Sequence, residues 1–282
     1  MRFGKFEINP VYDGFFALDG GAMFGVVPKV FWEKTNPADE RNRIQLALRT
    51  LLVKTENELV LIDTGIGDKF QEKFRDIYKV DKRFNIDESL KKIGIEPETI
   101  KIVINTHLHF DHCGGNTRFN DRGEVVPRFP TAIYYIQEAE WRHANNPDVR
   151  SKASYLKENF VPLEKFGNLR LIEGDKEIVK GIEVIKTAGH TPGHQIVLIK
   201  SETKTAVYWG DLIPTASHLN LPYVMGYDLF PLTTINWKEK LLWQALKEEW
   251  LMIFEHDPQI SFGYLRQEQG RFKCQPVEDH SE

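Results

Sequence analysis

The sequence predicts an α/β protein in which two β-sheets pack together with helices outside them. Three observations indicate this class. Strand-like apolar runs come first, helical patterns follow, and strands and a further helix then return. Histidine and aspartate residues gather directly after several of these runs, where strands end in loops. No Ser/Gly/Pro-rich linker or block of like charge divides the chain.

In the first half of the chain, four short apolar runs predict strands. They cover residues 44–54, 58–65, 101–105 and 131–136. Thr-Glu-Asn between the first two runs predicts a hairpin turn. Helical patterns cover residues 68–78, 87–93, 137–145 and 151–160. Asp87 is the predicted N-cap of the second of these helices.

Short strands return in the second half of the chain. They are predicted at residues 169–174, 181–189, 194–200, 205–211 and 251–256, and the last of these is the final strand that the pattern predicts. Residues 236–250 carry Trp and Leu at helical spacing, which indicates a helix that turns an apolar stripe toward the core.

The composition is that of an ordinary globular chain. Apolar residues make up 41% and charged residues 28% of the 282 residues, and we expect one domain over residues 1–282. A net charge of −4 disfavours a nucleic-acid or anionic-membrane partner. No run is apolar enough to span a bilayer, and the first residues lack a signal-peptide core. Two cysteines, Cys113 and Cys274, form no disulfide framework, so we expect a cytoplasmic location.

Residues 106–115, THLHFDHCGG, concentrate histidine and aspartate in one short segment. The segment begins where the predicted strand 101–105 ends, and two glycines close it. Strand ends that open into loops are where rigid scaffolds present reactive groups. His107 and His109 can point the same way from extended backbone, because alternate side chains share a face.

Three further polar segments follow strand-like runs, and they carry His190, Asp211 and His256. If these strand ends meet, they bring five imidazoles and two carboxylates together. This donor set suits zinc and the related divalent metals Mn, Fe and Co. Seven ligands exceed one tetrahedral zinc and fit two metals bridged by a carboxylate. A structural role for each histidine taken singly does not account for four such segments. The candidate ligands are His107, His109, Asp111, His112, His190, Asp211 and His256.

This constellation resembles the signature of the metallo-β-lactamase superfamily. The resemblance is carried by His107-Leu-His109-Phe-Asp111-His112, by His190, Asp211 and His256 in that order, and by Asp63 in LIDTG. It implies a four-layer αββα sandwich with the metals at one edge of the two sheets.

The same resemblance implies a role for each residue. One metal would be held by His107, His109 and His190, and the other by Asp111, His112 and His256, with Asp211 as the bridge. Asp63 would orient the ligand loop without binding a metal, and His194 would support the site in the same way.

Particular residues limit which branch of the superfamily the sequence resembles. His109 stands where diiron redox members carry Glu, and no Lys/Arg-rich insertion serves a tRNA substrate. Residues 18–32, 210–228 and 254–258 resemble the YtnP-like proteins, described as quorum-quenching lactonases. We therefore expect a binuclear hydrolase that opens acyl-homoserine or related lactones, small-molecule esters, by attack of a metal-bridging hydroxide. Asp111 is expected to pass the proton of the attacking water to the leaving alkoxide.

Three alternatives stay open. A phosphotriesterase similar to methyl parathion hydrolase shares part of the 210–214 segment. A glyoxalase-II-like thioesterase would use basic residues such as those in 263–273. A non-catalytic metal-binding protein would normally have lost ligands, and this chain keeps all seven.

An apolar segment at residues 22–32 is the first candidate for a substrate contact. It either packs in the core, or forms a homodimer contact, or builds an apolar wall for an acyl chain from Met23, Phe24 and Trp32. His143, Cys274 and His280 are expected to have no special role.

A second candidate is the loop that follows Asp211. Better-characterised acyl-homoserine-lactone lactonases place a tyrosine three residues after the bridging aspartate, where it contacts the substrate carbonyl, and this chain has Pro214. The missing contact would come from His218, Tyr223 or Tyr227, and His218 is favoured only because it is nearest to Asp211.

Overall fold

The computed structural model describes residues 1–277, so His280 lies outside the described residues. The chain divides into two compact units. Unit 1 comprises residues 1–14 and 48–174, and unit 2 comprises residues 15–47 and the chain from Asp175 onward. Two of the boundaries fall inside long strands, β2 (Phe6–Asp19) and β3 (Arg43–Lys54). A single domain over residues 1–282 therefore stays a prediction.

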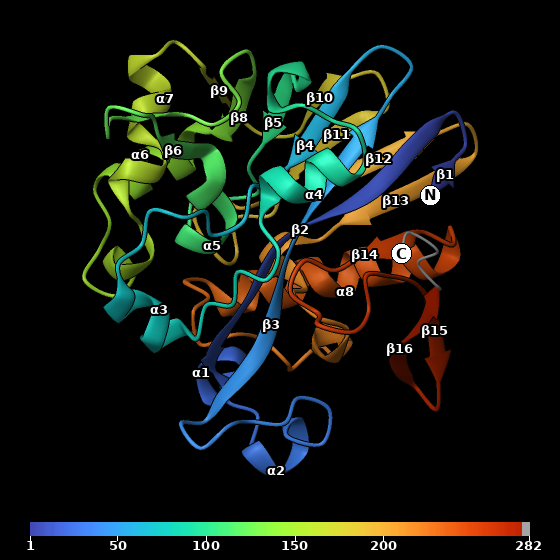
Figure 1. The fold of residues 1–282 in the computed structure, drawn as a ribbon. Coiled ribbons are helices and arrows are strands. Elements are labelled where there is room, and N and C mark those ends of the chain that lie inside the picture. Colours follow the sequence, from blue (N-terminus) through green and yellow to red (C-terminus); the bar gives the residue numbers. More distant parts are fainter. Residues whose placement is uncertain (278–282) are drawn as a thin grey trace. The chain divides into compact units, whose positions relative to one another are not determined.

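The first sheet has seven strands in the order β1-β2-β3-β4-β5-β8-β9 (Figure 1). Besides β2 and β3 it contains β1 (Arg2–Phe3), β4 (Leu59–Ile62), β5 (Ile102–Ile104), β8 (Ile133–Gln137) and β9 (Leu169–Ile172). The strands predicted between residues 44 and 174 are confirmed. The hairpin turn is confirmed as well, since Thr55 N donates to Glu58 O at 2.9 Å and β3 runs antiparallel to β4. β2 escaped prediction because Pro10 and Gly14 interrupt its pattern.

Parallel pairing in this sheet fixes where the reactive residues emerge. β4 pairs with β5 and β5 with β8, all parallel, and Ile62 lies opposite Ile104. The residues after β4 and β5 therefore leave the sheet at the same edge, where open α/β sheets place their ligands.

The helices of unit 1 fill the connections between these strands. They are α3 (Glu72–Tyr78), α4 (Ile86–Lys92), α5 (Phe110–Cys113), α6 (Glu138–Asn145) and α7 (Val161–Lys165), with short 3₁₀ turns at Pro97–Thr99, Gly114–Asn116, Lys152–Ser154 and Lys157–Asn159. β6 (Thr117–Phe119) and β7 (Val125–Pro127) form a separate two-stranded sheet. α6 packs against β8 and β9 (Figure 1).

Two helix predictions in unit 1 are wrong in detail. The N-cap of α4 is Asn85, whose side chain accepts from Glu88 N at 2.9 Å, whereas Asp87 lies in the first turn and binds Arg128. The helix predicted at 151–160 is two 3₁₀ turns separated by extended backbone at Tyr155. The Tyr155 hydroxyl donates to the buried Glu140 at 3.1 Å, and this tertiary contact overrides the local helical pattern.

The second sheet has seven strands in chain order, β10 to β16. They are β10 (Lys176–Val179), β11 (Ile182–Lys186), β12 (Gln195–Ser201), β13 (Lys204–Tyr208), β14 (Leu251–Ile253), β15 (Phe262–Glu268) and β16 (Arg271–Val277). Only β13 and β14 pair in parallel. The predicted strands as far as residue 256 are confirmed, but β14 is not the last strand. β15 and β16 form a hairpin through Gln269 and Gly270, whose φ values of 50° and 76° are those of a primed two-residue turn.

The remaining helices belong to unit 2. They are α1 (Gly20–Phe24), α2 (Lys29–Trp32) and α8 (Pro231–Lys247), with 3₁₀ turns at Gly210–Leu212 and Ala216–Leu219. α8 begins five residues earlier than the predicted 236, because Pro231 occupies its first turn, where a missing N–H costs nothing. Within residues 1–277, no helix combines the length and apolar character needed to cross a membrane.

Candidate metal centre

In unit 1, Asp63 organises the residues that leave the sheet edge. Asp63 directly follows β4 and adopts a left-handed φ of 57°, a conformation that Asp and Asn tolerate better than most residues. Its carboxylate accepts from Thr106 N and Thr106 Oγ1, both at 2.7 Å. Oδ2 also lies 3.1 Å from Nδ1 of His112. The predicted orienting role of Asp63 therefore has a geometric basis.

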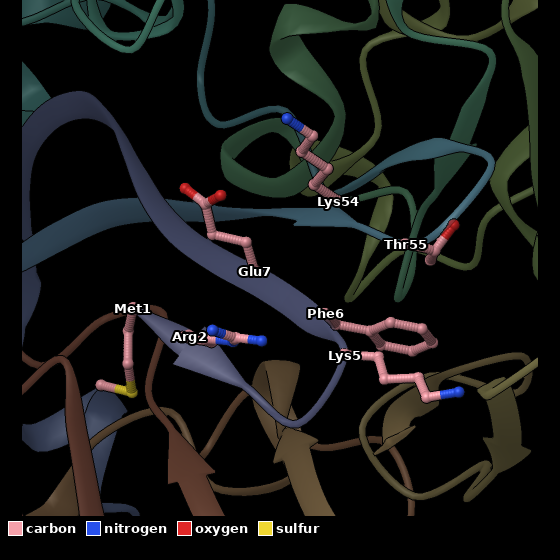
Figure 2. A pocket seen from close by; sticks show the side chains of 7 residues that line it. All are labelled: Met1, Arg2, Lys5, Phe6, Glu7, Lys54 and Thr55. Carbon is pink, nitrogen blue, oxygen red and sulfur yellow. The ribbon is translucent and has the colours of Figure 1, made fainter. Parts of the chain in front are cut away.

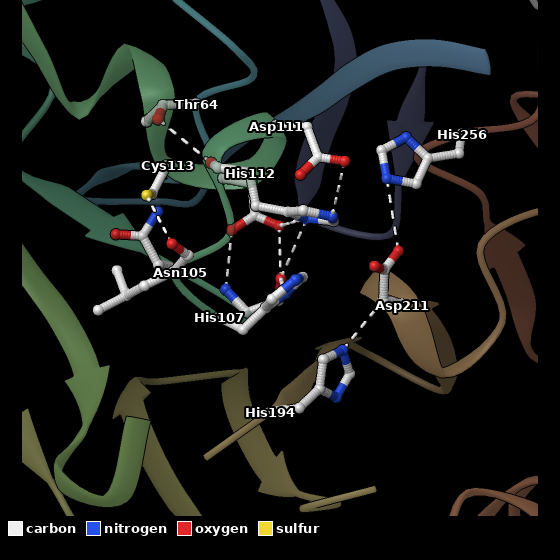
Figure 3. Close-up of polar contacts among 12 residues, drawn as sticks. Thr64, Asn105, His107, Asp111, His112, Cys113, His194, Asp211 and His256 are labelled. Carbon is white, nitrogen blue, oxygen red and sulfur yellow. Dashed lines mark hydrogen bonds and ion pairs between the residues drawn. The ribbon is translucent and has the colours of Figure 1, made fainter. Parts of the chain in front are cut away.

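The histidine segment of unit 1 places its donors close together. Nδ1 of His107 lies 3.1 Å from Thr106 Oγ1, whose proton goes to Asp63. His107 and His109 offer ring nitrogens within 4.8 Å of each other, and so do Asp111 and His112 with a carboxylate oxygen and a ring nitrogen. Nε2 of His112 is 3.8 Å from Asp111 Oδ2 (Figure 3). These side chains are almost entirely buried.

Close backbone contacts fix the end of the histidine segment and leave no space for a side chain at its two glycines. Thr64 N donates to His112 O at 2.8 Å (Figure 3 shows the two residues side by side). A Cβ on Gly114 would stand 2.1 Å from Ile66 O, and one on Gly115 would stand 2.2 Å from Thr64 O. The two glycines after the motif are therefore required by this close approach.

Unit 2 contributes a second set of donors. Asp211 follows β13 and His256 follows β14, and the parallel pairing of Tyr208 with Ile253 brings both to one edge. His190 lies in the turn between β11 and β12. Asp211 Oδ2 is 3.1 Å from His190 Nε2, and Oδ1 is 3.4 Å from His256 Nε2. One carboxylate thus presents one oxygen to each imidazole.

The Nδ1 atoms of these two histidines have their own acceptors. Nδ1 of His256 lies 2.8 Å from Ala47 O, and Nδ1 of His190 lies 2.8 Å from Asp228 Oδ1. Burial by itself would lower the pKa of His190, but Asp211 and Asp228 outweigh it and raise that pKa to about 10. An environment that holds a proton on Nε2 so firmly also favours a metal cation there.

His194 differs from the other histidines of the site. Its Nε2 accepts from Asp211 N at 3.0 Å (Figure 3), and its Nδ1 lies 2.7 Å from Thr187 Oγ1. Both ring nitrogens are engaged within the protein, so His194 fixes the backbone of Asp211 and has no nitrogen left for a metal.

The donors of both units have the chemistry that a divalent metal requires. His107, His112, His190 and His256 each engage Nδ1 with a hydroxyl, a carboxylate or a carbonyl, which leaves Nε2 as the ligand nitrogen. Nε2 of three of them faces Asp111 or Asp211. Imidazole and carboxylate in this combination suit zinc and its divalent relatives, so the residues fit the predicted metals.

The apolar residues predicted to contact substrate are buried within unit 2. Met23, Phe24 and Trp32 are at most 1% exposed. The Phe24 ring stacks on Trp32 at 5.3 Å and on His218 at 4.5 Å. A Cβ on Gly20 would stand 2.4 Å from the Trp32 ring, so the packing is tight. This arrangement favours core packing for these three residues, whereas Val26, Val30 and Phe31 of the same segment are exposed.

The three candidates for the missing carbonyl donor have different surroundings. Nδ1 of His218 is 2.8 Å from Thr215 Oγ1 and Nε2 is 2.9 Å from Met23 O. Both nitrogens are therefore engaged in holding the Met23 segment, which argues against His218 as the donor. Tyr223 and Tyr227 are partly exposed and stay candidates.

A surface hollow of about 270 Å³ lies in unit 1, at the end of the β1–β2 hairpin (Figure 2). It is lined by Met1, Arg2, Lys5, Phe6, Glu7, Lys54 and Thr55. None of the predicted ligands lines it, and its charged side chains are exposed, so we assign it no chemistry.

Sequence reasoning missed two residues that hold predicted ligands. Asp228 contacts His190 across 38 residues, and Glu140 Oε1 accepts from Leu108 N at 2.9 Å, between two predicted ligands. Asp228 is the last residue of the 210–228 stretch, but no spacing rule links it to His190.

Comparisons with known proteins cover most of this chain. Residues 49–256 match the family described as the metallo-β-lactamase superfamily. An N-acyl homoserine lactonase of Bacillus sp is 32% identical over 231 residues, which are 76% of this chain and 82% of that protein. An N-acyl homoserine lactonase of Bacillus cereus is 31% identical over 233 residues, 77% of this chain and 83% of that protein.

Solved structures agree with the family match. A probable metal-dependent hydrolase from Staphylococcus aureus superposes with a TM-score of 0.90 at 33% identity, covering 99% of this chain and 100% of that one. A dizinc quorum-quenching lactonase with bound product gives a TM-score of 0.81 at 20% identity, covering 100% and 97%. These matches confirm the predicted α/β class and its αββα architecture.

Proposed function

Because the chain belongs to the metallo-β-lactamase superfamily, we propose that it is a metal-dependent hydrolase of ester bonds whose substrate is a lactone. The observation that carries this proposal is Asp211, which offers one oxygen to His190 at 3.1 Å and the other to His256 at 3.4 Å. A carboxylate in this position is what a pair of bridged metals requires. The relatives named N-acyl homoserine lactonases support an acyl-homoserine lactone as the first substrate to test.

The proposed ligand set is the one that the superfamily resemblance implies. His107, His109 and His190 would hold one metal, Asp111, His112 and His256 would hold the other, and Asp211 would bridge them. Asp63 and His194 would bind no metal and would instead hold the ligands His112 and Asp211 in place. Zinc is the proposed metal, and Mn, Fe and Co share its preference for this donor set.

When bound, the two metals would supply hydroxide near neutral pH and polarise the substrate carbonyl. A side chain of the protein would transfer the proton of the attacking water. Asp111 is 6% exposed and lies next to His112, so its carboxylate can accept the proton of the attacking water. The water oxygen bonds to the carbonyl carbon, the ring C–O bond breaks, and Asp111 returns the proton to the leaving alkoxide. The product is a hydroxy acid.

A cysteine nucleophile is not needed. Cys113 adjoins the motif, but burial raises the pKa of its thiol, and Sγ donates to Leu108 O at 3.3 Å. A thiol in this state is a poor nucleophile at neutral pH.

The decisive experiment combines metal analysis with rates on four substrates: an acyl-homoserine lactone, a δ-lactone, a glutathione thioester and paraoxon. We expect about two metals per chain, turnover of the lactones well above that of the other two, and loss of both metal and turnover in His107→Ala. His143→Ala is the matched control, because His143 is a histidine of unit 1 outside the ligand set, and its ring contacts Ser151, Asp148 and Tyr155.

Each other outcome has a definite meaning. Preferred turnover of paraoxon or the thioester would move the substrate to a phosphotriester or a thioester. Two metals with no hydrolysis of any substrate would identify a non-catalytic metal-binding protein. Equal metal content in His107→Ala and wild type would remove the proposed ligand set.

Two further proposals, a homodimer and a cytoplasmic location, rest on the sequence alone. Light scattering coupled to size exclusion tests the homodimer, and fractionation of cells tests the location.

A further inference from the structure

Asp228 is a buried residue in the loop before α8, and its carboxylate has one hydrogen-bond partner within the described residues 1–277. It is 3% exposed, and its Oδ1 lies 2.8 Å from His190 Nδ1. Its Oδ2 is buried and has no hydrogen-bond partner among residues 1–277. A buried carboxylate with one oxygen unsatisfied is costly unless positive charge lies nearby.

The neighbouring backbone holds Asp228 opposite His190. Leu229 N donates to His190 O at 3.1 Å, and Phe230 N donates to Gly189 O at 2.9 Å. A Cβ on Gly189 would stand 2.4 Å from Thr234 Oγ1, so the His190 turn packs directly on the first turn of α8. The backbone hydrogen bonds and the packing on α8 therefore both fix the position of Asp228 relative to His190.

Lys238 of α8 anchors the start of the same loop. Its Nζ donates to Asn220 O at 2.9 Å and to Tyr223 O at 2.8 Å. Lys238 is fully buried, and burial lowers its pKa to about 7 although Asp228 favours the charged form. Gly226 N donates to Ala22 O at 2.7 Å, which ties the middle of the loop down.

We propose that Asp228 is a positioning residue for the metal at His190, and that Lys238 holds the loop from which it acts. By accepting a hydrogen bond from His190 Nδ1–H, Asp228 Oδ1 fixes the tautomer in which Nε2 carries the lone pair, and it strengthens that nitrogen as a ligand. This inference rests on the proposed metal at His190. When bound, that metal would supply positive charge on the far side of the His190 ring from the buried Asp228 carboxylate.

The test is zinc affinity, measured by competition with a chromophoric chelator on protein stripped of metal. Asp228→Ala should weaken one zinc site tenfold to a hundredfold, the range found when such supporting groups are removed. Asp228→Asn keeps an acceptor for Nδ1–H without the charge, so its loss should be smaller but above threefold. Asp175→Asn is the matched control, since Asp175 is an exposed aspartate of the same unit.

A purely structural role would lower the melting temperature of both Asp228 variants and leave their zinc affinity unchanged. Zinc affinity within twofold of wild type in folded Asp228→Asn would therefore overturn the proposal, even if Asp228→Ala does not fold. Wild-type protein that binds no zinc would instead contradict the proposed function, so the two failures are distinguishable.

Lys238→Met tests the second part. This variant should weaken zinc threefold or more, and the double variant with Asp228→Asn should be no weaker than Asp228→Asn alone, because both changes act through one contact. Additive losses would show that Lys238 does not act through Asp228.

Discussion

Asp63 and His112, which are 49 residues apart in the chain, meet with Oδ2 and Nδ1 3.1 Å from each other. The same carboxylate also takes two hydrogen bonds from Thr106, so it fixes both ends of the short segment that carries the histidines. A contact of this kind orients a ligand and raises its basicity.

Asp63→Asn should therefore weaken metal binding by about tenfold to a hundredfold. Asparagine tolerates the left-handed backbone at this position, so the effect reports the lost charge and the lost acceptor oxygen and not backbone strain. Zinc competition is the measurement, and Asp121→Asn, at an exposed aspartate of the same unit, is the control. An affinity equal to wild type would remove the orienting role.

Asp211→Ala should lower metal content and lactone turnover together, because a single carboxylate faces both His190 and His256. Elemental analysis of protein expressed with ample zinc should give about one metal per chain or fewer. A variant that retains two metals and full rate would show that Asp211 does not bridge.

Trp32→Ala should destabilise the protein by about 3–5 kcal/mol, the usual cost of emptying a large aromatic site in a core. Trp32 is 1% exposed and stacks on Phe24, so its removal leaves a cavity. Urea unfolding measures the loss. Phe31→Ala, at a neighbour that is 55% exposed, should change stability by roughly 0.5 kcal/mol or less.

The same variant separates core packing from an acyl pocket. Core packing predicts equal changes in KM for short and long acyl chains. A much larger rise in KM for long chains would instead place Trp32 at the substrate.

His218→Gln should flatten the dependence of stability on pH in mildly acidic solution. Burial lowers the pKa of His218 to about 3, whereas an unfolded histidine titrates near 6.5. Between these values the unfolded chain binds one more proton, so the folded state loses stability as the pH falls, by up to about 1.4 kcal/mol per pH unit. Unfolding free energies of both proteins at pH 7 and pH 5 check this. Parallel pH profiles would mean that His218 titrates normally.

Tyr223→Phe and Tyr227→Phe test the donor that would replace the tyrosine absent at Pro214. Loss of one donor to a developing oxyanion costs about 2.7–4 kcal/mol, or roughly a hundredfold to a thousandfold in kcat. We expect one of the two variants to lose at least tenfold in kcat with unchanged metal content. If both stay within twofold, carbonyl polarisation depends on the metals alone.

Much of the fold could be predicted because its signals are local. The runs that became β3, β4, β5 and β8 are short, apolar and rich in β-branched residues, and each is a strand in the structure. The errors arose where distant contacts outweigh local pattern. Tyr155 gives up helical backbone to reach Glu140, and Asn85 caps α4 while Asp87 is taken by Arg128.

The sequence by itself determined the types of the metal donors. The histidines and aspartates that could bind metal follow directly after strand-forming runs, and this order can be read from the chain without a structure. Only the tertiary structure decided which residues hydrogen-bond to these donors. Asp228 reaches His190 across 38 residues, and both ring nitrogens of His194 and His218 are engaged within the protein. The reason is physical: a strand pattern is written in neighbouring residues, whereas a hydrogen-bond partner in a folded chain depends on how loops distant in sequence pack together.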